Sequence, residues 1–126
     1  MAKTVLLVDD SGTMRNILAQ ALSFSGLELV KLEAEDGEKA LELFKTNNID
    51  LIITDINMPK MDGLTLIAEI RKLSKTVPIL VLTTESKDTL KQQALYMGAT
   101  GWIIKPFKPA QIISLLKETL NQNKVS

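Results

Sequence analysis

The chain has 126 residues, of which 45% are hydrophobic and 24% are charged, so its size and composition are those of one folded domain and exclude a disordered segment. The net charge is zero, so the overall charge does not favour nucleic acid or a membrane surface, and no apolar stretch approaches the roughly 20 residues that span a bilayer. The absence of cysteine and histidine excludes disulfides, thiol nucleophiles, zinc-thiolate sites and imidazole-based catalytic dyads.

Strand and helix patterns alternate five times along the chain, which is typical of β-α-β units and a parallel sheet. The first strand is predicted at residues 4–8, a short apolar run that ends at two acids. Apolar residues then recur at helical spacing from residue 14 to residue 22, and Gly26 is the expected C-cap of that helix. A weaker strand is predicted at about 28–32, and Asp36 is the expected N-cap of the following helix.

The second half of the chain repeats the same alternation. The remaining predicted strands cover residues 51–54, 79–82 and 102–104. A helix is predicted after each of these strands. The helix after the strand at 79–82 is expected to have Ser86 as its cap and to stop at Gly98. Pro109 lies near the first turn of the last helix. No linker or repeat interrupts the pattern, so we expect residues 1–126 to form a single domain.

The carboxyl ends of the predicted strands carry polar side chains. Asp9 and Asp10 follow the first strand, Asp55 the third, Thr83 the fourth and Lys105 the fifth. Ligands of open α/β sheets bind at this edge. Clustered carboxylates repel each other unless a cation is present, and an all-oxygen site suits Mg²⁺. Carboxylates, Mg²⁺ and an ammonium group can together neutralise a phosphoryl group in transfer, with an aspartate as nucleophile.

Four blocks of residues, in this order along the chain, resemble the receiver domains of response regulators. They are VDDS at 8–11, DINMPKMDG at 55–63, TT at 83–84 and KPF at 105–107. The similarity extends over the whole chain, leaves no room for an output domain, and is strongest to the single-domain, CheY-like chemotaxis branch. It implies an α/β fold of the flavodoxin-like (CheY-like) class, with a doubly wound five-stranded parallel sheet in the order 2-1-3-4-5 and five helices.

The resemblance also implies a metal site and a phosphoacceptor. Asp55 matches the phosphoacceptor of the family. Asp10 and Asp55 would bind Mg²⁺ through their carboxylates, Asn57 through its backbone carbonyl, and Asp9 mainly through water.

Two further site residues would contact the phosphoryl group itself. Thr83 would donate its hydroxyl to one phosphoryl oxygen and Lys105 would pair with another. The peptide bond between Lys105 and Pro106 is expected to be cis. Asn57 and Glu85 match positions that tune the rate of dephosphorylation in the family.

A switch mechanism follows from the same resemblance: Thr83 moves toward the phosphoryl group, and an aromatic residue of the fifth strand turns inward. Here that residue is Trp102, where the family usually has Tyr or Phe, and a buried indole needs a partner for its N–H. The alternative is that Trp102 is a fixed surface aromatic. Tyr96, Leu95 and Leu115 lie off, or at the margin of, the buried stripes of the last two helices. Together with Trp102 we expect them to form a partner-docking patch.

The function implied is that of a two-component phosphoacceptor, in which a chemotaxis-type histidine kinase phosphorylates Asp55. The switched face would dock onto a flagellar motor switch protein or another downstream partner, and a phosphatase is a further expected partner. We expect a monomeric, cytoplasmic signalling domain that binds no nucleic acid and inserts into no membrane. It would not be an enzyme, since it catalyses only its own phosphoryl transfer and dephosphorylation. A phosphate sink or a relay receiver without motor binding remains an alternative.

Other classes of protein fit the residues less well. A small Mg²⁺-dependent phosphatase with an aspartate nucleophile typically has a second acid two residues later, where this chain has Asn57. A flavodoxin-like binding module needs a glycine-rich loop after the first strand, where this chain has DDSG at 9–12. A receiver that works without phosphorylation is disfavoured because all the site residues are present. Arg15 and Asn16, early in the first helix, could contact a partner or solvate the start of the helix, and we expect the second. Lys60 and Lys108 border the site and are expected to be solvated charges and not ligands.

Overall fold

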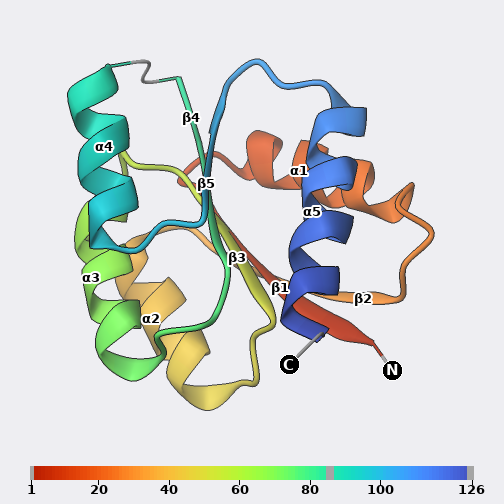
Figure 1. Ribbon diagram of the computed structural model, residues 1–126, viewed down its shortest axis with the longest axis horizontal. Helices are drawn as coiled ribbons and strands as arrows, with labels where there is room; N and C mark the ends of the chain where they lie inside the picture. The colour runs from red at the N-terminus through yellow and green to blue at the C-terminus, as the bar shows by residue number, and fades with distance from the viewer. Residues whose placement is uncertain (1, 85–86, 125–126) are drawn as a thin grey trace.

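The computed structural model describes residues 2–84 and 87–124, with side chains as far as residue 120. Within this part of the chain a five-stranded parallel sheet has the order β2-β1-β3-β4-β5 (Figure 1). The strands are β1 (Lys3–Val8), β2 (Leu29–Ala34), β3 (Leu51–Thr54), β4 (Ile79–Thr83) and β5 (Gly101–Ile104). The predicted fold class and strand order are therefore confirmed, and each strand lies within two residues of its predicted position.

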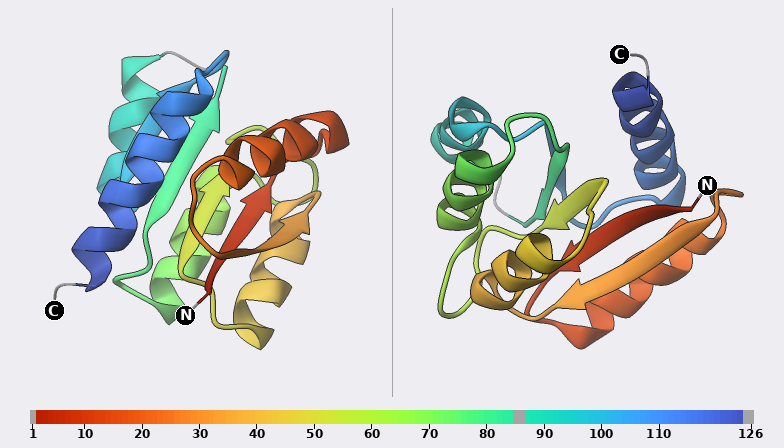
Figure 2. Two further views of the ribbon diagram at one scale, coloured as in Figure 1. Left: turned by 90° about the vertical axis from the view of Figure 1, so that its right-hand side faces the viewer. Right: turned by 90° about the horizontal axis from the view of Figure 1, so that it is seen from below.

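Among the described residues, five helices cover the two faces of the sheet. They are α1 (Gly12–Ser23), α2 (Gly37–Thr46), α3 (Gly63–Leu73), α4 (Asp88–Met97) and α5 (Pro109–Lys124). Helices α1 and α5 lie on one face, and α2, α3 and α4 lie side by side on the other (Figures 1 and 2). None of these helices is both long and apolar enough to cross a membrane.

Short polar side chains begin three of the helices. Ser11, Asp36 and Asp62 precede α1, α2 and α3, and each accepts a hydrogen bond from the backbone N–H three residues later. The prediction that Asp36 caps α2 is confirmed. The predicted cap Ser86 lies outside the described residues; α4 is preceded by Lys87, whose side chain makes no capping hydrogen bond.

The prediction that Gly26 caps α1 is wrong. The helix ends at Ser23, and Phe24 is the C-cap residue, with its backbone N–H bonded back to the last turn. Gly26 instead lies in the loop to β2 with φ of 77°, so its left-handed conformation serves the loop and not the helix end. Gly98, with φ of 118°, is the C-cap of α4 as predicted.

Strands β3 and β4 are buried along their whole length, and β1 over its last four residues, which explains why their sequences are continuous apolar runs. Alternate side chains enter two separate hydrophobic clusters. Leu6 and Ile52 pack with α2, α3 and α4, whereas Val5 and Ile53 pack with α1 and α5. Polar functional groups can therefore begin only where these strands end, at the carboxyl edge of the sheet.

Candidate metal centre

The acids meet because β1 and β3 are neighbours that end at the same level. Val8 is paired with Thr54 at the end of the ladder, and the backbone N–H of Asp55 donates to the carbonyl oxygen of Val8 at 3.0 Å. On the other side of β1, the backbone N–H of Asp9 donates to the carbonyl oxygen of Ala34 in β2 at 3.1 Å. The backbone thus fixes Asp9 and Asp55 at adjacent strand ends.

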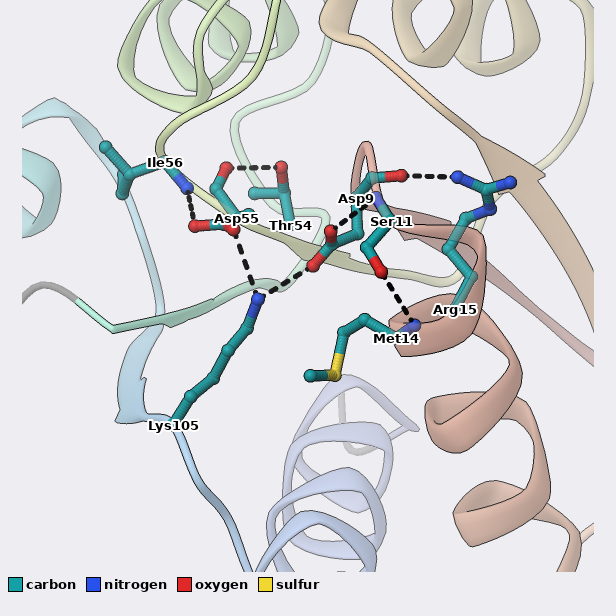
Figure 3. Close-up of polar contacts among 8 residues, drawn as sticks. All are labelled: Asp9, Ser11, Met14, Arg15, Thr54, Asp55, Ile56 and Lys105. Carbon is teal, nitrogen blue, oxygen red and sulfur yellow. Dashed lines mark hydrogen bonds and ion pairs between the residues drawn. The ribbon is translucent and has the colours of Figure 1, made fainter.

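Asp9, Asp10 and Asp55 form a compact carboxylate cluster. One carboxylate oxygen of each residue lies within 4.8 Å of the others. Asp9 is buried, Asp55 is half-buried and Asp10 is exposed. Figure 3 shows the Asp9 and Asp55 carboxylates facing the same space from neighbouring strands. The cluster therefore extends from the edge of the core to solvent and is open on the side of Asp10.

Lys105 places a positive charge against this cluster. Its Nζ donates to Asp9 Oδ2 at 2.8 Å and to Asp55 Oδ2 at 3.1 Å (Figure 3). Burial alone would lower the pKa of Lys105, but the hydrogen bond to Asp9 and the charges of Asp55 and Asp9 outweigh it and raise the pKa above its ordinary value. Lys105 is thus a cation throughout the physiological range. Its peptide bond to Pro106 is cis, as the resemblance implied.

The turn after β3 orients the Asp55 carboxylate. Asp55 Oδ1 accepts a hydrogen bond from the backbone N–H of Ile56 at 2.6 Å, while Oδ2 faces Lys105. The Thr54 hydroxyl donates to the carbonyl oxygen of Asp55 at 2.9 Å. Gly63 lies against the same turn, where an added Cβ would overlap that carbonyl oxygen. No local pattern in the sequence indicates this close approach, because it is made by the tertiary fold.

The donor set fits a hard divalent cation. Three carboxylates converge, and Lys105 is the cation paired with them among the described residues. Oxygen donors without thiolate or imidazole suit Mg²⁺, which is bound through few carboxylates and keeps several waters. The Asp10 carboxylate has no hydrogen bond or ion pair within the described residues, so it is available as a ligand. Asn57 is exposed two residues beyond Asp55.

The two predicted switch residues lie on neighbouring strands. Thr83 is fully buried at the end of β4, and its carbonyl oxygen accepts the backbone N–H of Lys105 at 2.8 Å. Trp102 is paired with Val81 across the ladder and packs against the cluster beneath α2, α3 and α4. The indole Nε1 of Trp102 is buried and has no hydrogen-bond partner within the described residues.

The predicted docking residues are only partly gathered on one face. Tyr96 and Leu95 on α4 are 93% and 40% exposed. Leu115 on α5 is half-buried and packs into the cluster on the opposite face of the sheet from Trp102. Ile104 of β5 is 40% exposed, although its place in an apolar strand gives no sign of this in the sequence. The exposed apolar residues in this region therefore lie mainly on α4 and β5.

The expectation that Arg15 only solvates the start of the first helix is wrong. Its side chain is only 18% exposed, and it donates to the carbonyl oxygen of Asp9 and, at 2.9 Å, to Glu33 Oε1. Glu33 is 18 residues away on β2, so no local pattern could have shown this contact. Lys60 and Lys108 are exposed, as expected.

The family model described as the response regulator receiver domain matches residues 5–117. The chain belongs to this family. Chemotaxis protein CheY of Bacillus subtilis is 35% identical over 121 residues, which cover 96% of this chain and all of that protein. CheY1 of Helicobacter pylori is 42% identical over 122 residues, which cover 94% of this chain and 98% of that protein.

Longer proteins are similar to this chain as well. The transcriptional regulatory protein PhoP of Bacillus subtilis is 32% identical over the whole chain, which spans only 52% of that protein. Among solved structures, the complex of CheX, CheY, BeF₃ and Mg²⁺ from Borrelia burgdorferi contains a chain with a TM-score of 0.85 and 31% identity. That match covers 92% of this chain and 87% of the other.

Membership of the receiver family defines the class of protein to which this chain belongs. A receiver domain is a phosphoacceptor of two-component signalling with a histidine kinase as its partner, and it is not an enzyme with turnover of a separate substrate. The small phosphatase is therefore set aside. The carboxylate cluster of Asp9, Asp10 and Asp55 agrees with the Mg²⁺ site of such a domain.

Proposed function

We propose that Asp55 is the phosphoacceptor and that Asp9, Asp10 and Asp55 bind Mg²⁺, with the Asn57 carbonyl as a further ligand. The observation that carries this proposal is the position of the Asp55 carboxylate, which shares one cluster with two other acids and touches Lys105 Nζ at 3.1 Å. A nucleophilic carboxylate, two further metal ligands and a fixed ammonium are thus present within one edge of the sheet.

In the proposed phosphoryl transfer, residues of this chain supply the nucleophile and the groups that contact the phosphoryl oxygens. A carboxylate oxygen of Asp55 attacks the phosphorus atom of a phosphohistidine; the P–O bond forms as the P–N bond breaks, and the imidazole nitrogen takes up a proton. Lys105, already beside Asp55, would pair with a phosphoryl oxygen, and the Thr83 hydroxyl would donate to another. Bound Mg²⁺ would neutralise charge on the phosphoryl oxygens.

We infer that the phosphorylated chain acts in chemotaxis and transmits its signal by docking onto other proteins. This inference is supported by the two CheY relatives, which the match covers almost completely, and by the Borrelia complex, in which CheY is paired with CheX. In this proposal residues 1–126 work as a single receiver domain, and the docking partner is a flagellar motor switch protein. A phosphate sink or relay receiver is the second candidate, favoured by the departure at Trp102 from the usual aromatic residue.

The N–H of Trp102, which lacks an acceptor within the described residues, supports its proposed role as the switch. A buried donor without an acceptor costs about 1–3 kcal/mol relative to one that is hydrogen-bonded. A rearrangement that gives Nε1 an acceptor would remove this cost. Phosphorylation that displaces Thr83 would offer such a rearrangement on the neighbouring strand.

The chain has one tryptophan, so its fluorescence reports on the proposed switch without ambiguity. We expect the emission to change on addition of Mg²⁺ and beryllofluoride, which imitates a phosphoryl group, because the indole moves between environments. The change should disappear in Asp55→Asn, which keeps the side-chain size but removes the acceptor carboxylate. An unchanged wild-type emission, with beryllofluoride binding verified by calorimetry, would show that Trp102 does not switch.

We propose that Tyr96, Leu95, Ile104 and Trp102 form the partner surface, with Leu115 of α5 at its margin across the edge strand β5. Tyr96→Ala should weaken binding of the phosphorylated chain to the motor switch protein by about tenfold or more, because exposed tyrosines at interfaces contribute strongly. Phosphorylation of Asp55 should be unaffected, since Tyr96 lies on α4 and outside the acidic cluster. Phe24→Ala is the matched control, because Phe24 is also highly exposed, at 80%, but follows α1. Equal loss of binding in both variants would contradict the proposed surface.

A further inference from the structure

Arg15 links three segments that meet at the acidic cluster. It belongs to the first turn of α1, and its Nη1 donates to the carbonyl oxygen of Asp9 at 2.5 Å (Figure 3). Its Nε donates to Glu33 Oε1 on β2 at 2.9 Å. With 18% of its side chain exposed, the guanidinium is held in one place by two charge-assisted hydrogen bonds, one to a carboxylate and one to a carbonyl.

The carbonyl that Arg15 contacts belongs to the peptide group that joins Asp9 to Asp10. The β1 ladder stops here: the N–H of Asp9 still pairs with Ala34, but its carbonyl oxygen is bonded by the Arg15 side chain. The Asp10 carboxylate has no hydrogen bond or ion pair of its own within the described residues. The direction in which Asp10 projects is therefore set by the backbone on either side of it. Arg15 holds the carbonyl of the peptide before Asp10, and the N–H of Ser11 after it donates to Asp9 Oδ1 at 2.9 Å.

We propose that Arg15 is a positioning residue of the metal site, which holds the Asp9–Asp10 peptide so that both carboxylates face the cation. This inference rests on the proposed function, in that it requires Asp9, Asp10 and Asp55 to bind a divalent cation. Glu33 completes the arrangement, because it pairs with the guanidinium and offsets the positive charge that Arg15 would otherwise place beside the metal.

Two possible roles of Arg15 predict opposite changes in the affinity for Mg²⁺ when the residue is replaced. If only its charge mattered, removal of a cation beside the site would strengthen Mg²⁺ binding, because like charges repel. If Arg15 positions the peptide, its removal must weaken Mg²⁺ binding, because Asp10 then has to be ordered when the metal binds. Loss of a residue that orients metal ligands typically costs about 10–100-fold in affinity.

The test is calorimetric titration of the metal-free chain with Mg²⁺. We expect Arg15→Ala to bind Mg²⁺ about tenfold more weakly than wild type. Lys39→Ala is the matched control: Lys39 lines the same cavity as Arg15, so the variant loses the same charge, but the hydrogen bond from Arg15 to the Asp9 carbonyl stays in place. It should bind Mg²⁺ as tightly as wild type or slightly more tightly.

Arg15→Lys is the second variant, for the case in which Arg15→Ala fails to fold as judged by circular dichroism. Arg15→Lys retains the charge and the apolar stem but replaces the planar guanidinium fork with one compact ammonium, which cannot reproduce the separate Nε and Nη1 contacts, so its affinity for Mg²⁺ should also fall. Unchanged or tighter binding in the folded Arg15 variants would overturn the positioning role while leaving the metal site intact. Absence of Mg²⁺ binding in the wild type would instead overturn the proposed function, and the inference with it.

Discussion

Replacement of Gly63 by alanine is expected to destabilise the fold by about 3 kcal/mol or more. An added Cβ would overlap the carbonyl oxygen of Asp55 and would lie 2.8 Å from Cα of Ile56. Both atoms belong to the backbone, so no side-chain rotation can relieve the overlap. The backbone N–H of Gly63 also donates to the carbonyl oxygen of Ile56 at 2.7 Å, which holds α3 against the turn. The substitution must therefore displace α3 or the phosphoacceptor turn.

The measurement is urea denaturation of Gly63→Ala beside Gly12→Ala. Gly12 also begins a helix, but an added Cβ there would meet its nearest atom, Arg15 Nη2, at 3.5 Å, which is ordinary contact. Gly12→Ala should leave stability unchanged or raise it by up to about 1 kcal/mol, because alanine restricts the unfolded chain. Equal unfolding midpoints for the two variants would show that the close approach at Gly63 is not a structural constraint.

Asp10→Asn is expected to lower Mg²⁺ affinity by about 100-fold or more, since loss of a ligand should exceed the 10–100-fold cost of losing a group that merely orients one. The same substitution should make the metal-free chain no less stable, and more stable by up to about 1 kcal/mol. Asp10 is exposed and has no hydrogen bond or ion pair within the described residues, so in the absence of metal it contributes repulsion toward Asp9 and Asp55. Asp10 is thus expected to favour Mg²⁺ binding while lowering the stability of the metal-free chain.

Calorimetric titration with Mg²⁺ and thermal unfolding in a chelator measure the two effects. Asp62→Asn is the control, because Asp62 is an acid outside the carboxylate cluster and asparagine caps a helix as well as aspartate does. That variant should keep both the affinity for Mg²⁺ and the melting temperature. Wild-type Mg²⁺ affinity in Asp10→Asn would remove Asp10 from the set of ligands.

Several features of the fold and site could be predicted because they depend on local patterns. The buried strands are continuous apolar runs, so their ends are visible as the points where polar residues begin, and the prediction for β3 is correct at both ends. Adjacent ends of parallel strands then bring Asp9 and Asp55 together whatever the surrounding loops do. The N-cap at Asp36 is likewise a local interaction between one side chain and the next turn.

Other features depend on contacts between distant segments and could not be predicted. The role of Gly63 arises only when α3 meets the turn after β3, and the buried state of Arg15 requires Glu33 on a different strand. The predicted helix end at Gly26 is wrong because a glycine with positive φ can serve a loop as readily as a C-cap. The Trp102 N–H has no acceptor among the described residues, and this depends on how β5 packs against its neighbours. The sequence does not specify that packing residue by residue.

The role of Asp55 as phosphoacceptor is tested by the intact mass of the chain after incubation with a small phosphodonor such as phosphoramidate, with and without Mg²⁺. We predict that the wild type gains one phosphoryl group only when Mg²⁺ is present, that hydroxylamine removes it as expected for an acyl phosphate, and that Asp55→Asn gains none. Equal labelling of Asp55→Asn, or no labelling of the wild type in the presence of Mg²⁺, would contradict the assignment of Asp55 as the phosphoacceptor.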